Sequence, residues 1–153
     1  MGRRIQIRFV KEEISAEAEL LEDQAPQTCQ AIWDILPAHA EAKHAMISGQ
    51  EIFAILETRL ELKLPKENAT TNVIPGDVAY TFVEGGRLHG FPEDICEITW
   101  YYGRVAAPQL PDGPNAVNIF ARILGDPSDF YDASQRIRTE GPKAVTIIRI
   151  EEK

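Results

Sequence analysis

The chain has no apolar run that approaches the roughly 20 residues needed for a helix to span a bilayer. Its residues 1–11 alternate charged residues with strand formers and lack the apolar core of a signal peptide. From both absences we expect a cytoplasmic protein that has no membrane partner.

Cysteine is also scarce, with only Cys29 and Cys96, and neither lies in a Cys-x-x-Cys pair or at a metal-ligand spacing. Both are flanked by apolar residues, which is typical of buried thiols. The sequence therefore predicts two free, buried cysteines. A reactive Cys29 at the start of a helix is the alternative.

Histidine is represented by His39, His44 and His89 alone. His39 and His44 have no carboxylate at an established ligand spacing. The glycine-rich segment 84–90 lacks the Gly-Lys-Ser or Gly-Lys-Thr end of a phosphate-binding loop and does not lead into a helix. We therefore predict no metal site and no cofactor, and we interpret segment 84–90 as a mobile flap beside a pocket.

Basic residues are too few and too scattered for a nucleic-acid-binding surface. The 153 residues include 16 Lys and Arg against 24 Asp and Glu, for a formal net charge of -8. Residues 1–11 contain four basic and no acidic residues, whereas residues 12–61 contain eleven acidic and two basic ones. Because nucleic-acid binding depends on clustered Lys and Arg that displace counterions from phosphates, we expect no nucleic-acid partner.

What the sequence does contain is a series of short stretches typical of β-strands, in several of which apolar residues occupy every second position. The predicted strands cover residues 5–9, 14–20, 42–48, 51–57, 78–83, 95–102, 117–124 and 144–151, with 59–64 as a further candidate. Helices are predicted from Pro26 to Pro37 and from Asp126 to about Arg138, and the proline-rich residues 103–115 are predicted to form a loop.

Eight or nine short strands with only two helices favour an all-β barrel or sandwich, because two helices are too few to cover both faces of a wide open sheet. Closing the sheet also removes the exposed edges that invite aggregation. Residues 1–153 contain no repeat, low-complexity tract or linker. We therefore predict one mainly β domain, a closed barrel of about eight strands with two helical caps.

Several short motifs carry a resemblance to a known fold family. Residues 25–33, APQTCQAIW, resemble the Ala-Pro-Lys-Thr-x-x-Asn-Phe opening of the first helix of cyclophilins. The stretches 43–53 (KHAMISGQEIF), 75–80 (PGDVAY), 98–103 (ITWYYG) and 118–123 (NIFARI) resemble a bacterial cyclophilin-like family of unknown function, domain of unknown function 3830. The resemblance implies a cyclophilin-like closed barrel capped by two helices, and no established activity.

The resemblance does not extend to the residues of a prolyl isomerase. Cyclophilins present a Phe-His-Arg cluster on the strand after the first helix, and the arginine polarises the prolyl amide. The matching stretch here, residues 42–49, contains His44 near the expected place but no arginine. Without a cation at that site the rotation of the amide bond has no evident electrostatic agent, so peptidyl-prolyl isomerase activity is the least favoured alternative.

The most specific expectation about a site comes from residues 117–124. If Val117, Ile119, Ala121 and Ile123 face the core, then Asn118, Phe120 and Arg122 point outward. An exposed aromatic ring between an amide and a guanidinium suits a planar or carboxylated group. The predicted neighbours at the barrel rim are His44, Trp100 and Tyr102, although alternation favours a place in the core for Trp100.

These residues predict a protein that binds a small polar or carboxylated metabolite, with or without transforming it, and they name no catalytic group. A second hypothesis is that the face with Phe120 is a subunit contact in a homo-oligomer without catalysis. Sequence alone leaves both readings of that face open.

Overall fold

We describe residues 2–57 and 64–151 of a computed structural model. The strands are β1 (Arg4–Phe9), β2 (Ile14–Leu20), β3 (Ala38–His44), β4 (Gly49–Ile55), β5 (Ala69–Thr70), β6 (Asp77–Val83), β7 (Ile95–Ala106), β8 (Gln109–Leu110), β9 (Gly113–Pro114), β10 (Val117–Ile123) and β11 (Lys143–Ile150). The helices are α1 (Pro26–Ile35) and α2 (Ser128–Glu140). Among the described residues no helix combines the length and the apolar character that crossing a bilayer requires.

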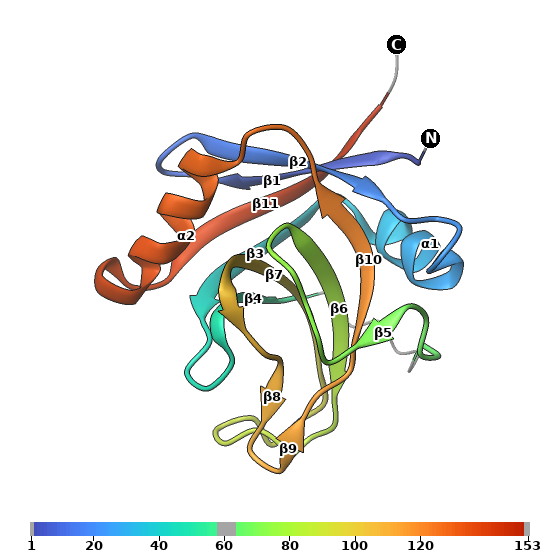
Figure 1. Ribbon diagram of the computed structural model, residues 1–153, viewed down its shortest axis with the longest axis vertical. Helices are drawn as coiled ribbons and strands as arrows, with labels where there is room; N and C mark the ends of the chain where they lie inside the picture. Colours follow the sequence, from blue (N-terminus) through green and yellow to red (C-terminus); the bar gives the residue numbers. More distant parts are fainter. Residues whose placement is uncertain (1, 58–63, 152–153) are drawn as a thin grey trace.

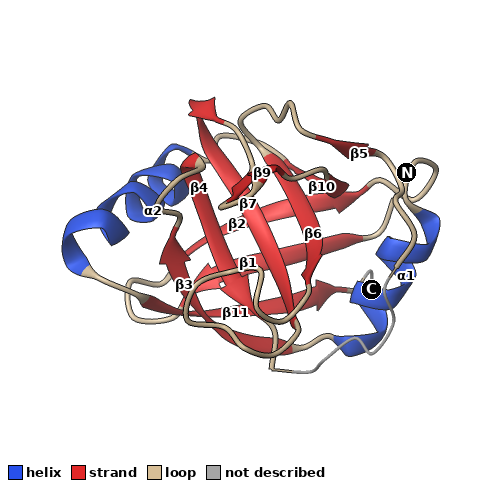
Figure 2. Ribbon diagram, turned by 90° about the horizontal axis from the view of Figure 1, so that it is seen from below, coloured by secondary structure: helices blue, strands red, loops and turns tan. Residues whose placement is uncertain are grey.

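Eight antiparallel strands form a closed barrel in the order β2-β1-β11-β3-β4-β7-β6-β10, and the pairing of β10 with β2 completes the circle (Figure 1). The short β5 pairs with β10 in addition, and β8 and β9 form a separate small hairpin. Seen from below, α1 and α2 lie at opposite ends of the barrel (Figure 2). The predicted cyclophilin-like barrel with two helical caps is therefore confirmed.

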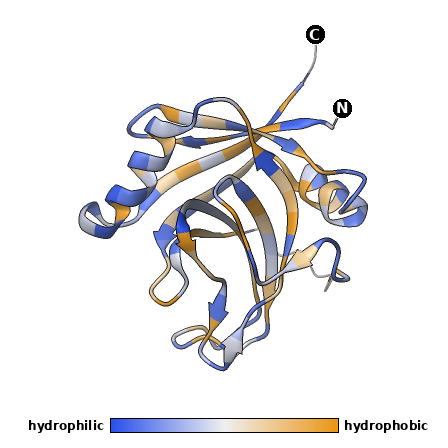
Figure 3. Ribbon diagram, in the orientation of Figure 1, coloured by the Kyte–Doolittle hydropathy of each residue, from blue (hydrophilic) through white to orange (hydrophobic). Residues whose placement is uncertain are grey.

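Alternation of apolar and polar residues places one side of each strand inside the barrel. In β1, Ile5, Ile7 and Phe9 are buried, and the residues between them are more exposed. The same alternation is visible along β1 and β2 when residues are coloured by hydropathy (Figure 3). Burying one face of each strand in this way stabilises the barrel through the hydrophobic effect.

Helix α2 closes one end of the barrel through an aromatic cluster. The ring of Phe130 lies 5.2 Å from that of Phe9 and 5.6 Å from that of Trp100. Nε1 of Trp100 also donates a hydrogen bond to the hydroxyl of Ser134 on α2. The helix is thus held to the strands by packing and by a buried hydrogen bond.

Helix α1 covers the other end, and its side toward the barrel includes Cys29 and Ile32. The first turn of α1 receives a capping interaction from Glu67, whose carboxylate accepts hydrogen bonds from the backbone N–H groups of Gln27 and Thr28. The thiols of Cys29 and Cys96 are both buried, as predicted. The alternative of a reactive Cys29 is wrong, because burial raises the pKa of its thiol to about 12.

Most predicted elements are present, with differences at their ends. Strand β3 begins at Ala38, before the predicted start, and ends at His44, so residues 45–48 form a turn. Strand β7 continues to Ala106. The predicted loop 103–115 contains the end of β7 and the β8–β9 hairpin. The candidate strand 59–64 lies almost entirely outside the described residues.

Candidate ligand-binding site

The two faces of β7 have different environments. Cys96, Ile98, Trp100 and Tyr102 belong to the core inside the barrel, as their alternation predicts. Glu97, Thr99 and Tyr101 alternate with these residues and therefore point to the outer face of the sheet. All three are nevertheless buried. Parts of the chain outside the barrel must therefore cover this face of β7.

A cavity of about 340 Å³, here called the outer pocket, lies on this outer face. Its floor consists of residues from β4, β6, β7 and β10. Its walls come from the turn after β3, from the segment between β6 and β7, and from the residues around β8. The lining residues are Ala45, Met46, Ile47, Ser48, Glu51, Phe53, Thr81, Leu88, His89, Phe91, Glu97, Thr99, Pro108, Gln109, Leu110, Pro111, Asn115 and Val117.

Glu51 on β4 is one of two acidic residues among these lining residues. It pairs in register with Tyr101 on β7, and the Tyr101 side chain is its hydrogen-bond partner. The hydroxyl of Tyr101 also lies 3.0 Å from that of Thr99, so Thr99 can donate while Tyr101 donates to Glu51. Burial raises the pKa of Glu51 to about 7, and the hydrogen bond from Tyr101 opposes this increase.

Glu97 on β7 is the second acidic residue in the outer pocket. Only 7% of it is exposed, and its Oε2 atom has no hydrogen-bond partner in the described part of the chain. Burial raises the pKa of Glu97 to about 8, and the negative charge of Glu51 adds to the increase. At neutral pH the two carboxyls are therefore partly protonated, and they hold protons that ordinary surface carboxyls would have lost.

Some polar groups in and beside the outer pocket are already paired. Thr81 lies opposite Glu97 in the β6–β7 register, and its hydroxyl accepts a hydrogen bond from the side-chain amide of Asn115. Arg87 forms a 3.2 Å ion pair with Asp112. Since these residues neighbour Leu88 and Pro111 in the sequence, the ion pair joins two walls of the outer pocket. The glycine-rich segment does lie beside a pocket, and its mobility stays a prediction.

Of the predicted site residues, His44 and Tyr102 are in contact, on the side of the barrel where β3 lies. His44 accepts a 2.7 Å hydrogen bond from the hydroxyl of Tyr102, and Arg138 on α2 donates to the same ring nitrogen. Trp100 is fully buried in the core, where its indole N–H is bonded to Ser134. None of His44, Trp100 and Tyr102 lines the outer pocket.

The predicted orientation of β10 is wrong for Val117, Ile119 and Phe120, whereas Ala121 belongs to the barrel core and Arg122 is exposed, as predicted. Phe120 is fully buried in the barrel core, whereas Val117 and Ile119 form a second apolar cluster with Ala79 and Tyr101 on the outer face. A register shift between Ile119 and Ala121 interrupts the alternation. Because the outer face of β10 is covered too, apolar residues occur on both of its faces, and their spacing could not identify the inner one.

The remaining two predicted residues on β10 have partners within the protein. Asn118 donates to the hydroxyl of Thr28 and to the carbonyl of Pro65. Arg122 is half exposed and lies 3.6 Å from the buried carboxylate of Asp77. Counted in either direction around the barrel, β10 and β3 are four strands apart. Asn118, Phe120 and Arg122 therefore do not form one groove with His44.

The outer pocket was missed at the level of sequence, although one signal for it was present. By their alternation, Glu97, Thr99 and Tyr101 occupy one face of a strand, and that face combines a carboxyl with two hydroxyls. Its association with Glu51 depends on the β4–β7 pairing, and its burial depends on loops that are distant in sequence. Neither long-range relationship leaves a local pattern.

The closed eight-stranded barrel with two helices is a cyclophilin-like fold. Among solved structures, the chain is similar to McbB in complex with tryptophan, at 17% identity and a TM-score of 0.70. That match covers 97% of this chain but 45% of McbB, so the chain spans less than half of McbB. It is also similar to a Cryptosporidium parvum cyclophilin-type peptidyl-prolyl cis-trans isomerase, at 11% identity, a TM-score of 0.54 and full coverage of both chains.

A further solved structure, the hypothetical protein AF2241 from Archaeoglobus fulgidus, is 27% identical with a TM-score of 0.58, over 97% of this chain and 95% of that one. No curated protein matches the chain. Residues 7–149 match the family described as "Protein of unknown function (DUF3830)". The chain belongs to this family.

Proposed function

We propose that this protein binds a small metabolite with an apolar body in the outer pocket, with the polar end of the metabolite toward Glu51 and Glu97. The observation that carries the proposal is the pocket itself. Its volume of about 340 Å³ lies in the range of small-molecule sites, which are typically about 300–1,000 Å³. Such sites combine mostly apolar walls with a few converging polar groups, and the outer pocket has this composition.

The acidic lining of the outer pocket favours a different ligand from the polar or carboxylated metabolite that the sequence predicts. Its described lining residues include two acidic side chains and no lysine or arginine. A ligand whose polar end is only a carboxylate would therefore bring a further negative charge close to Glu51 and Glu97. A small metabolite with a neutral or cationic polar end fits the outer pocket better than a carboxylated one.

A screen of small aromatic compounds by thermal shift, followed by calorimetry, tests the proposal. Indole compounds are a suitable first series, because the similar structure of McbB is described in complex with tryptophan. Phe53→Ala removes part of the floor and should weaken binding about tenfold, as expected for a lost aromatic contact. Ile148→Ala is the matched control, since Ile148 is an apolar residue that does not line the outer pocket. Equal affinities of both variants for every ligand found would contradict this location.

A second candidate function is self-association at the rim of the outer pocket. Met46 is 97% exposed, Val105 is 75% exposed and Ile47 is 56% exposed. The backbone N–H of Ala107 bonds to the carbonyl of Ser48, so the turn after β3 and the end of β7 lie together. Light scattering tests this candidate: an oligomer that becomes monomeric in Met46→Lys supports it, and a monomer at high concentration excludes it.

A further inference from the structure

Glu97 has a buried carboxyl atom, Oε2, that lacks a hydrogen-bond partner among the described residues of the outer pocket. Its neighbours in register are Thr81 on β6 and Ile55 on β4. The hydroxyl of Thr81 already accepts from Asn115, and Ile55 offers no polar side-chain atom. Oε2 of Glu97 thus remains buried and unbonded within the described residues. Since buried polar atoms are nearly always hydrogen-bonded, this atom requires an explanation.

Glu51 lies farther along the same outer face. In the β4–β7 register, the pair Phe53 and Thr99 separates the position of Glu51 from that of Glu97. Both carboxyls are 7% exposed, so water screens them poorly. A charged group bound at Glu97 is therefore also within the field of Glu51.

The surroundings favour a positive charge and an apolar body in the ligand. None of the described lining residues is a lysine or arginine that would neutralise the carboxyls, and His89 is exposed. Phe53 in the floor and Leu88, Phe91 and Leu110 in the walls are apolar. An ammonium group donates hydrogen bonds and accepts none, so it can satisfy Oε2 in a way that a carboxylate ligand cannot.

We propose that the outer pocket recognises an organic amine, with its ammonium group bound to the carboxylate of Glu97 and its apolar body held between Phe53 and the walls. The inference rests on the proposed function and specifies its ligand class. Glu51 strengthens the attraction, and Thr99 with Tyr101 holds the Glu51 carboxyl in place. Binding is accompanied by release of a proton, because Glu97 must be ionised to pair with the ammonium.

The experiment uses three compounds that share an indole body and differ in the end group: tryptamine, tryptophol and indole-3-propionate. Calorimetry should show that tryptamine binds at least about tenfold more tightly than tryptophol, and that indole-3-propionate binds most weakly. The affinity for tryptamine should increase from about pH 6 to about pH 8.5, since the carboxyls lose their protons while an alkylammonium stays charged. Measurements in two buffers of different ionisation enthalpy should reveal the released proton.

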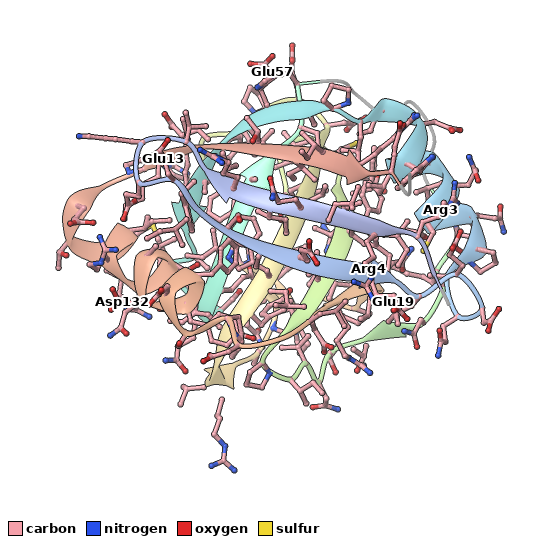
Figure 4. All side chains as sticks on the ribbon, turned by 90° about the horizontal axis from the view of Figure 1, so that it is seen from above. Arg3, Arg4, Glu13, Glu19, Glu57 and Asp132 are labelled. Atoms are coloured by element: carbon pink, nitrogen blue, oxygen red, sulfur yellow. The ribbon has the colours of Figure 1, made fainter. Side chains whose placement is uncertain are left out.

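Glu97→Gln should remove the preference for tryptamine over tryptophol and leave the affinity for tryptophol within about twofold. Glu51→Gln should reduce the preference in part. Glu57→Gln is the matched control, because Glu57 is an exposed carboxylate outside the outer pocket, on the periphery of the molecule (Figure 4). Thermal unfolding confirms that each variant is folded.

The possible failures separate the two proposals. If tryptophol binds as tightly as tryptamine, or if Glu97→Gln keeps the full preference, the amine inference is wrong, whereas the proposed function stands as long as Phe53→Ala weakens binding and Ile148→Ala does not. If none of the three compounds binds and a wider panel of aromatic amines and alcohols also fails, both the amine inference and the proposed function are overturned.

Discussion

The indole Nε1 of Trp100 donates a hydrogen bond of 3.1 Å to the hydroxyl of Ser134, and this hydroxyl donates in turn to the carbonyl of Phe130 over 2.9 Å. All three residues are buried. The chain of hydrogen bonds connects the inner face of β7 with α2, at the point where the aromatic rings of Phe9, Trp100 and Phe130 meet. Trp100 is therefore a structural support for the helical cap.

Ser134→Ala tests this support. The change leaves the indole N–H buried without an acceptor, which should lower the free energy of unfolding by about 1–3 kcal/mol. Ser128→Ala, at an exposed position of the same helix, should change it by less than about 0.5 kcal/mol. Urea unfolding measures both variants. A loss in Ser134→Ala no larger than in the control would show that the hydrogen bond does not stabilise the helical cap.

Glu97 makes a specific contribution to the pH dependence of stability. Its pKa in the folded protein is about 8, above the ordinary 4.5, so the folded state binds more protons than the unfolded state between these values. Its contribution is most favourable below about pH 4.5 and is lost as the pH rises through about 8. The Glu97→Gln variant has no titrating group at position 97. Its free energy of unfolding should therefore increase relative to that of the wild type as the pH rises.

We expect similar stabilities of Glu97→Gln and the wild type near pH 5, and an advantage of the variant on the order of 2 kcal/mol near pH 8. Urea unfolding at several pH values measures the difference. Glu57→Gln should show no comparable pH-dependent gain, since Glu57 is exposed. If the difference in free energy of unfolding between Glu97→Gln and the wild type were constant with pH, burial would not raise the pKa of Glu97.

Burial lowers the pKa of His44 and so favours its neutral form, and its hydrogen bonds determine which ring nitrogen carries the proton. Its Nδ1 donates to the carbonyl of Ala45, and its Nε2 accepts from the Tyr102 hydroxyl and from Nε of Arg138. Because arginine cannot accept a hydrogen bond, Nε2 carries no proton. Burial lowers the pKa of His44 below its ordinary 6.5, and the charge of Arg138 lowers it further. The contribution of neutral His44 to the free energy of unfolding is therefore present above about pH 6.5 and is lost as the pH falls below it.

Arg138→Gln and Tyr102→Phe should each raise the pKa of His44, the first by removing a nearby positive charge and the second by removing a donor to the neutral ring. An NMR titration of the imidazole in each variant measures the change. Arg136→Gln is the control on the same helix, because the Arg136 guanidinium pairs with Glu12, Asp132 and Glu140. An unchanged His44 titration midpoint in both test variants would show that these contacts do not set its protonation.

The barrel could be predicted because its evidence is local. Alternation in residues 5–9 and 14–20 identified β1 and β2, and Pro26 and Pro37 bounded α1 to within two residues. The inner face of β7 also follows from local sequence, because Cys96, Ile98, Trp100 and Tyr102 occupy every second position of the strand and all lie in the core.

The candidate site could not be predicted because its evidence is long-range. Glu51 and Glu97 are brought to one face by the β4–β7 pairing, and loops that end far away in the sequence enclose them. On β10 the second apolar cluster, with Val117 and Ile119, gives the outer face the character of a core. Residue spacing gives the period of a strand, but the covering segments decide which face is inside.

Phe120 provides the last test, because its substitution distinguishes a residue of the barrel core from a residue of a subunit contact. Its side chain is fully buried among the core residues, so Phe120→Ala should lower the free energy of unfolding by about 3–5 kcal/mol through lost burial and a residual cavity. Phe120→Asp should prevent folding and should not act by separating subunits. Ile148→Ala, at a partly exposed apolar position, should change stability by less than about 1 kcal/mol. Circular dichroism with urea unfolding measures all three, and a folded Phe120→Asp with wild-type stability would place this ring on the surface.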